Sequence, residues 1–248
     1  MGIPTFAETI AQYEYPGRIV LLGRDGRFDV AVYCVTARSA SSRAKVYAYD
    51  RTASKIAVVA TDPEVMSQGN LDLLDYTACH FGDGFLVIGN GSQTDAAAAD
   101  AGMDGAGAKL RRSLSAVSYE PDKYRIPRIT GCISWAEGNE TAAIHSVRSD
   151  AQGSAVRDGY DIPLESGRGF FVRTYAGPNV RPTPSFEGGP VEVSLDFGSA
   201  SECARQIYGS LAPADGGEDL RVSVVAVYRE IGTGERLVSI LNQEEIGA

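Results

Sequence analysis

The sequence predicts an α+β fold in which two mainly antiparallel sheets pack together and helices cover their outer faces. Short β-rich segments separated by glycine-containing turns run through most of the chain. Two helical regions interrupt them, one central and one near the C-terminal end. These elements do not alternate regularly as strands and helices do in a Rossmann domain, so a doubly wound parallel sheet is not predicted.

The predicted strands are rich in Val, Ile, Tyr and Phe and are bounded by turn residues. The turns Gly23-Arg24-Asp25-Gly26 and Gly82-Asp83-Gly84 each separate two such segments, as in a hairpin. We therefore expect strands over residues 18–23, 28–36, 44–49, 55–60, 74–81, 85–88, 128–135, 141–147, 169–174, 191–195, 220–228 and 236–241.

The central helical region follows a polar, glycine-rich turn and begins with four alanines. Alanine favours helix, and Leu110 and Leu114 continue at helical spacing. Three glycines interrupt the region, so we expect two helical pieces or a helix with a loop, with Asp95 as a cap of the first turn. A second helix is predicted over residues 200–211 and opens at Ser199.

Length and charge limit the possible functions. The chain has 248 residues, of which 44% are hydrophobic, and we expect one domain spanning residues 1–248. The net charge of −9 repels nucleic acid and anionic membranes, so neither is expected as a partner and an anionic ligand needs a local basic pocket. The N-terminal sequence lacks a basic start followed by an apolar run, and a cytoplasmic location is expected.

The four cysteines are widely scattered along the chain and form no CxxC pair. A structural zinc site needs clustered ligands, and two histidines are all that could supplement them. We expect buried, reduced cysteines, no metal site and no cofactor.

A first polar segment covers residues 33–43, at the end of an apolar strand. Arg38 and Arg43 flank small hydroxyl residues there, and the planar donor fork of arginine suits phosphate or a polarised carbonyl oxygen. Taken alone, the segment is more typical of a solvated loop with surface arginines.

A second polar segment joins Tyr76 to the run Asn90-Gly91-Ser92-Gln93-Thr94-Asp95. Glycine at position 91 lets backbone N–H groups approach a ligand, and the run leads into a helix start, which favours anions. The alternative is an ordinary turn.

A third polar segment covers residues 119–129 and contains Glu120, Arg125 and Arg128. Pro121 disfavours helical geometry in the residue before it, so we expect Glu120 at a helix end. Its carboxylate is a candidate base, or a member of a surface ion network.

In this order, the three segments resemble the archaeal-type IMP cyclohydrolase family. The resemblance rests on ARSASSR at residues 37–43, on Tyr76 ahead of NGSQTD at residues 90–95, and on SYEPDKYRIPRI at residues 118–129. It spans roughly residues 17–131, with a fainter echo at Thr174-Tyr175. The family closes 5-formamidoimidazole-4-carboxamide ribonucleotide to IMP with loss of water, in purine biosynthesis. Its fold is similar to the four-layer αββα sandwich of N-terminal-nucleophile hydrolases, although its members use no terminal nucleophile, and the start Met1-Gly2-Ile3 offers none here.

The resemblance implies three catalytic residues. Glu120 is the expected base for the amide nitrogen, Tyr76 the donor to the formyl oxygen, and Arg43 an electrostatic support. The expected substrate-binding residues are Arg38, Asn90, Ser92, Thr94 and Arg128, of which Arg128 could bind phosphate or orient Glu120.

Two residues depart from the family pattern, because Cys34 stands where an arginine is frequent and Gln93 where a histidine is frequent. Two other functions stay open. A different amidohydrolase on the same fold would need a terminal nucleophile, whereas a nonenzymatic purine-nucleotide-binding module would not need Glu120. A homo-oligomer is a further possibility that the sequence does not decide.

Overall fold

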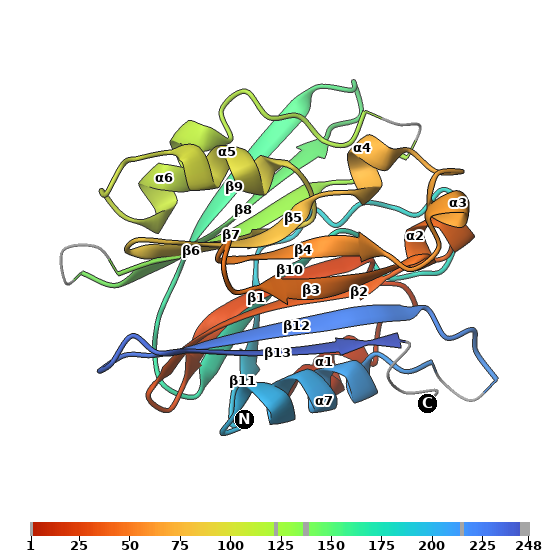
Figure 1. The fold of residues 1–248 in the computed structure, drawn as a ribbon. Coiled ribbons are helices and arrows are strands. Elements are labelled where there is room, and N and C mark those ends of the chain that lie inside the picture. Colours follow the sequence, from red (N-terminus) through yellow and green to blue (C-terminus); the bar gives the residue numbers. More distant parts are fainter. Residues whose placement is uncertain (1, 122–123, 136–138, 214–215, 244–248) are drawn as a thin grey trace.

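Two antiparallel sheets lie face to face in the computed structural model, which describes residues 2–121, 124–135, 139–213 and 216–243 (Figure 1). In the described part of the chain, the first sheet has six strands in the order β11-β10-β1-β2-β12-β13. Their bounds are β1 Arg18–Asp25, β2 Phe28–Thr36, β10 Arg168–Arg173, β11 Val191–Ser194, β12 Arg221–Glu230 and β13 Arg236–Asn242.

The second sheet has seven described strands in the order β3-β4-β5-β6-β7-β8-β9, each antiparallel to its neighbours. Each strand is thus beside the next one along the chain, as the hairpin signals predict. Their bounds are β3 Lys45–Asp50, β4 Lys55–Ala60, β5 Thr77–Gly82, β6 Phe85–Gly89, β7 Arg128–Ser134, β8 Thr141–Ser149 and β9 Ala155–Ile162.

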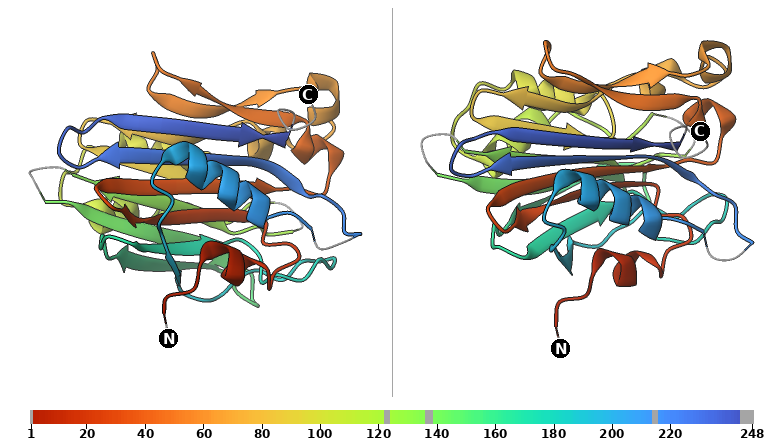
Figure 2. Two further views of the ribbon diagram at one scale, coloured as in Figure 1. Left: turned by 90° about the horizontal axis from the view of Figure 1, so that it is seen from below. Right: turned by 60° about the horizontal axis from the view of Figure 1, so that its bottom comes forward.

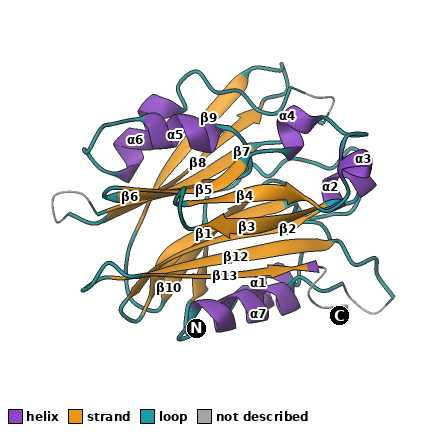
Figure 3. Cartoon of the chain, in the orientation of Figure 1, coloured by secondary structure: helices purple, strands orange, loops and turns teal. Residues whose placement is uncertain are grey.

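Helices cover the outer face of each sheet (Figure 3). Helices α1 (Phe6–Ile10) and α7 (Ala200–Ser210) lie on the six-stranded sheet, which is clearest from below (Figure 2). Helices α5 (Gln93–Ala99) and α6 (Ala106–Ser113) lie on the seven-stranded sheet. Three four-residue helices, α2 (Ala40–Arg43), α3 (Pro63–Met66) and α4 (Leu71–Leu74), stand at one end of the strands.

Alternating side chains along β1 show how the sequence builds these layers. Val20 and Leu22 face the core between the sheets, while Ile19 and Leu21 face the core beneath α1 and α7. Each of these side chains is fully buried, and burial of one such side chain contributes about 1.5–3 kcal/mol. A strand buried on both faces reads as a continuous apolar run, as residues 19–22 do.

The predicted α+β class with two mainly antiparallel sheets is confirmed. Predicted strands 28–36 and 55–60 have the observed bounds of β2 and β4, and the central helical region forms two pieces. Ser199 caps α7 by accepting a hydrogen bond from the Glu202 amide, as expected. The four cysteines are unpaired and buried, which confirms that prediction.

Three local predictions are wrong. Strand β9 was not predicted, because polar and charged residues dominate this edge strand. The strand predicted over residues 74–81 begins only at Thr77 in β5, because Leu74 ends helix α4, which Asn70 caps by accepting from the Asp72 amide at 3.1 Å. Asp95 does not cap α5, whose N-cap position is Ser92 without a side-chain hydrogen bond; the Asp95 carboxylate contacts His80 at 2.7 Å.

The longest described helix, α7, has eleven residues, and no helix in the described ranges has the length and apolar character needed to cross a membrane.

Candidate functional site

One cavity of about 310 Å³ opens at the end of the sandwich where α2 and α4 lie. Its wall comes from segments far apart in the sequence, and both halves of the chain contribute. The lining includes Tyr15, Arg18, Arg38, Ser39, Ser41, Ser42, Asn70, Leu74, Tyr76, Asn90, Glu120, Ile126, Thr174, Tyr175 and Arg181. Such a volume falls within the range of small-molecule sites.

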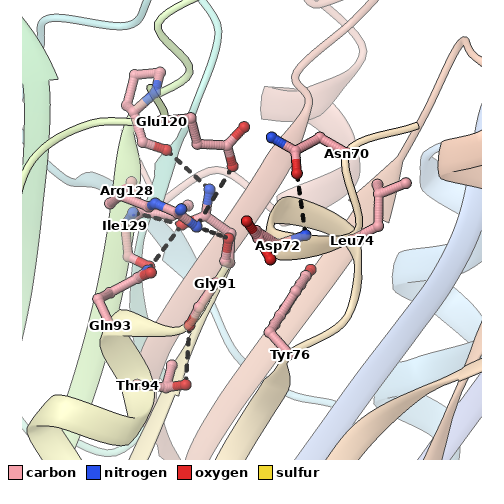
Figure 4. Close-up of polar contacts among 12 residues, drawn as sticks. Asn70, Asp72, Leu74, Tyr76, Gly91, Gln93, Thr94, Glu120, Arg128 and Ile129 are labelled. Carbon is pink, nitrogen blue, oxygen red and sulfur yellow. Dashed lines mark hydrogen bonds and ion pairs between the residues drawn. The ribbon is translucent and has the colours of Figure 1, made fainter. Parts of the chain in front are cut away.

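Four of the eight residues expected to form a site line this cavity, namely Tyr76, Glu120, Arg38 and Asn90. Tyr76 and Glu120 are 6% exposed each, so both reach the cavity from an otherwise buried position. Figure 4 shows Glu120 beside Arg128 on one side, and Tyr76 with the turn that carries Asn70 on the other. Tyr76 and Glu120 are 44 residues apart in the sequence, and both side chains reach the same cavity.

The other four do not line the cavity. Arg43 is the last residue of α2, and its guanidinium donates to the Asp219 carbonyl at 2.5 Å. Ser92 is exposed, and the buried Thr94 hydroxyl donates to the carbonyls of Thr77 and Gly91. Arg128 lies behind Glu120, with 3.6 Å between its guanidinium and the Glu120 carboxylate.

Glu120 does not end a helix, which corrects the expectation from Pro121. Helix α6 ends at Ser113, and Glu120 stands in the following loop, where its amide donates to the Ile126 carbonyl at 2.9 Å. The loop returns the chain to β7, which begins with Arg128. The ion pair is buried, because each of the two side chains is only 8% exposed.

Gly91 makes room for the Arg128 side chain. A Cβ at position 91 would stand 1.6 Å from the Arg128 guanidinium, so only glycine leaves room for that side chain. Arg128 also donates to the Asn90 carbonyl at 3.2 Å. The NGS run therefore packs behind the Glu120 carboxylate.

The Asn90 side chain is itself held by the protein. Its amide donates to the Pro127 carbonyl at 2.8 Å, and its oxygen accepts from the Ile129 amide at 2.7 Å. Gln93, one of the two departures from the family pattern, donates to the same oxygen at 3.2 Å. Cys34, the other departure, packs in the core beneath α1 and α7, on the face of β2 opposite Tyr33.

The Tyr76 hydroxyl lies between two other phenols. It is 2.8 Å from the Tyr33 hydroxyl of β2 and 2.6 Å from the Tyr47 hydroxyl of β3. Burial raises the pKa values of Tyr33 and Tyr47 well above the ordinary value for a phenol, so both stay protonated at neutral pH. Lys45, fully buried beside them, lies with its Nζ 5.1 Å from the centre of the Tyr76 ring.

Arginines give the cavity a positive wall in a chain of net charge −9. Arg18 opens β1 and donates to the Thr36 carbonyl at the end of β2. Arg38 stacks on the Tyr15 ring at 4.3 Å and donates to Asn179, Val180 and Thr183. Arg38 thereby ties the loop that carries Arg181 to the cavity.

Sequence reasoning missed Arg18, Arg181 and Tyr15, and it marked Tyr175 only through the fainter echo of the family pattern at Thr174-Tyr175. The glycine at position 17 could have indicated this part of the site. A Cβ there would stand 2.2 Å from the Thr174 hydroxyl, and its φ of +76° suits glycine. This close approach brings residues 174–175 beside the start of β1. The role of the C-terminal half was open in the sequence, and the structure brings its Thr174, Tyr175 and Arg181 to the cavity.

Among the residues that the structure describes, no group of three or more His, Cys, Asp or Glu side chains has the arrangement of a metal site.

Comparison with known proteins gives the cavity a context. A sequence model of the IMP cyclohydrolase-like protein family matches residues 15–234. A protein named IMP cyclohydrolase from Methanothrix thermoacetophila is 30% identical over 79% of this chain and 86% of its own length. Relatives with the same name come from Halobacterium salinarum, at 27% identity over 79% of this chain and 85% of the relative, and from Methanopyrus kandleri, at 35% over 47% and 57%. The match covers every cavity-lining residue considered above, and the chain belongs to the family of IMP cyclohydrolase-like proteins.

Proposed function

We propose that this chain is an IMP cyclohydrolase, which closes 5-formamidoimidazole-4-carboxamide ribonucleotide to IMP with loss of water. Membership of the family and the names of its relatives support this function. The observation that carries it is the position of Glu120 and Tyr76, which face one cavity from different segments of the chain.

The reaction requires little more than positioning and proton transfer. The carboxamide nitrogen attacks the formyl carbon of the same molecule, so no covalent nucleophile is needed. Glu120 accepts a proton from that nitrogen, and Tyr76 donates a hydrogen bond to the formyl oxygen as charge develops on it. The same oxygen then leaves as water after gaining two protons, the one that Glu120 accepted from the carboxamide nitrogen and the one that the formamide nitrogen loses as its double bond to the former formyl carbon forms.

Arg128 is suited to orient Glu120 more than to bind phosphate. Its guanidinium lies 3.6 Å from the Glu120 carboxylate and outside the cavity lining. Removal of one partner of a buried ion pair is strongly unfavourable, so each side chain restricts the other to this arrangement.

The substrate phosphate fits the arginine side of the cavity, near Arg38 and Arg181. Arginine donors suit phosphate oxygens, and the hydroxyls of Ser39, Ser41 and Ser42 on the same wall add further donors. Arg18 lines the same cavity and adds positive charge to it. Arg43, the electrostatic support that the resemblance implies, would have to release the Asp219 carbonyl to reach the cavity.

We also propose that the fold is the N-terminal-nucleophile-hydrolase-like αββα sandwich that the resemblance implies. Two antiparallel sheets with two longer helices on each outer face support it. One domain over residues 1–248 is supported by the first sheet, which joins β1 and β2 to β10–β13.

Ring closure tests the proposed function directly. Purified protein is mixed with the formamido ribonucleotide without added metal, and IMP formation is followed by ultraviolet absorbance. We expect turnover by the unmodified protein and a loss of about 10²- to 10⁴-fold in kcat for Glu120→Gln, with IMP affinity nearly unchanged.

Glu235→Gln is the matched control, because it makes the same change at an exposed position in the β12–β13 turn. It should keep full activity. If the unmodified protein binds purine nucleotides but forms no IMP, the function is wrong and the chain is a binding module.

A further inference from the structure

Three phenol hydroxyls meet at the wall of the cavity, and the middle one belongs to Tyr76. Tyr33 comes from the six-stranded sheet, whereas Tyr47 and Tyr76 come from the seven-stranded sheet and the residue preceding β5. Tyr76 lines the cavity. Tyr33 and Tyr47 lie behind it, with exposed fractions of 0% and 2%. The packing of the two sheets therefore fixes both neighbours of the Tyr76 oxygen.

The number of protons in this group limits how it can be hydrogen-bonded. Each phenol has one proton, and two hydrogen bonds join the Tyr76 oxygen to those of Tyr33 and Tyr47. If Tyr76 donated to Tyr33 or Tyr47, its proton would point away from the cavity. Its proton is free for a ligand only when Tyr33 and Tyr47 both donate to it, and a phenol oxygen has two lone pairs to accept them.

The surroundings favour this arrangement. Within the described ranges, the hydroxyls of Tyr33 and Tyr47 have hydrogen-bond partners only among the three phenols, whereas Tyr76 also faces the cavity. A buried hydroxyl that donates to nothing is unfavourable. The two buried phenols therefore donate to Tyr76, and Tyr76 donates into the cavity.

We propose that Tyr33 and Tyr47 are positioning residues that orient the Tyr76 proton into the cavity, toward the oxygen that leaves the substrate. This inference rests on the proposed function for its substrate. Its structural part, the direction of three protons, does not depend on turnover.

Phenylalanine substitutions test the kinetic consequence. The rings of Tyr33 and Tyr47 pack edge to face, with 5.8 Å between centres, and those of Tyr47 and Tyr76 with 6.3 Å, so Phe keeps the packing and removes the oxygen. Tyr33→Phe and Tyr47→Phe should each lower kcat by about 3- to 30-fold with KM nearly unchanged.

A second background separates positioning from a general loss of structure. In a Tyr76→Phe protein, adding Tyr33→Phe or Tyr47→Phe should lower kcat no further, because the proton that they orient is gone. Tyr228→Phe is the matched control, since Tyr228 is fully buried and donates to Asp25 at 2.9 Å on the six-stranded sheet. It should lower the unfolding temperature and keep kcat. Losses that stay additive in the Tyr76→Phe background would overturn the proposal.

Neutron diffraction on deuterated crystals decides the orientation whether or not IMP is formed. We expect the deuterons of Tyr33 and Tyr47 on the lines to the Tyr76 oxygen, and that of Tyr76 directed into the cavity. A Tyr76 deuteron directed at Tyr33 or Tyr47 would overturn the proposal. Absence of turnover in the unmodified protein would contradict the proposed function alone.

Discussion

The arginines Arg18 and Arg38 that line the cavity and the arginines at the other end of the six-stranded sheet are held in opposite ways. At one end, the fully buried Asp29 side chain pairs with Arg24 at 2.8 Å and with Arg229 at 3.1 Å, and both arginines also pair with Glu140. At the cavity end, Arg18 and Arg38 donate to carbonyl, amide and hydroxyl oxygens within the described ranges. Arg18 and Arg24 are the same residue type on one strand, about 20 Å apart.

The difference indicates that the ion pairs around Asp29 stabilise the fold, whereas the arginines at the cavity are suited to bind a ligand. At the paired end, two carboxylates neutralise two guanidinium groups. Burial still raises the pKa of Asp29 against the effect of Arg24, so the ionised carboxylate depends on both cations. Arg18 and Arg38 at the cavity donate to neutral oxygens, and an anionic nucleotide would supply the negative charge.

Arg24→Met should have the largest effect, and on stability alone. It leaves the Asp29 carboxylate buried with one cation, which we expect to cost about 3 kcal/mol of unfolding free energy near neutral pH. The deficit should shrink as the pH falls, because protonated Asp29 needs no cation. Urea unfolding at several pH values measures it, and kcat of the folded protein should not change. A large loss of kcat would contradict the separation of the two ends.

Arg18→Met and Arg43→Met compare the loss of an arginine that lines the cavity with the loss of one that lies outside the lining. We expect Arg18→Met to lower kcat/KM by about 10- to 100-fold, as for the loss of a charged donor. Arg43→Met should cost about 3- to 10-fold, because Arg43 ties α2, whose serines line the cavity, to Asp219. Steady-state kinetics compares them. A greater loss from Arg43→Met would show that its guanidinium enters the cavity, as the resemblance implies.

Lys45→Met should have the smallest effect, visible as a pH dependence of stability. Burial, and then the charge of Arg18, lowers the pKa of Lys45 well below its ordinary value. Between that lowered pKa and the unfolded value of about 10.4, the unfolded chain binds one more proton than the folded protein, so stability rises with pH.

The expected slope from Lys45 is at most about 1.4 kcal/mol per pH unit, and it should be absent in Lys45→Met. Urea unfolding of both proteins between about pH 7 and pH 9 gives the difference, in which their shared titrations cancel. Parallel stability curves would show that Lys45 is charged in the folded protein.

Much of the fold was predictable because its signals are local. Continuous apolar runs such as residues 19–22 and the turn glycines mark the strands, and Ser199 marks the start of α7. Strand β9 lacked such a signal, since it is an edge strand with charged and polar residues. The short helix α4 was missed, since its local signal is one capping side chain, that of Asn70.

The site was predictable only in part, because a cavity is a long-range feature. The three polar segments supplied Glu120, Tyr76, Arg38 and Asn90. They did not indicate Arg181, which lies in a loop that the sequence showed only as rich in proline and glycine. Nor could they show that Gly91 makes room for Arg128, or that Tyr33 and Tyr47 meet at Tyr76, since the distances between these side chains depend on how the sheets pack.

A crystal structure with bound IMP tests the central claim most directly. We expect the hypoxanthine ring to lie between Glu120 and Tyr76, and the phosphate to lie near Arg38 and Arg181. Nucleotide bound elsewhere, for example in the pocket that Arg205 of α7 and Ser239 of β13 line, would contradict the assignment of this cavity as the active site.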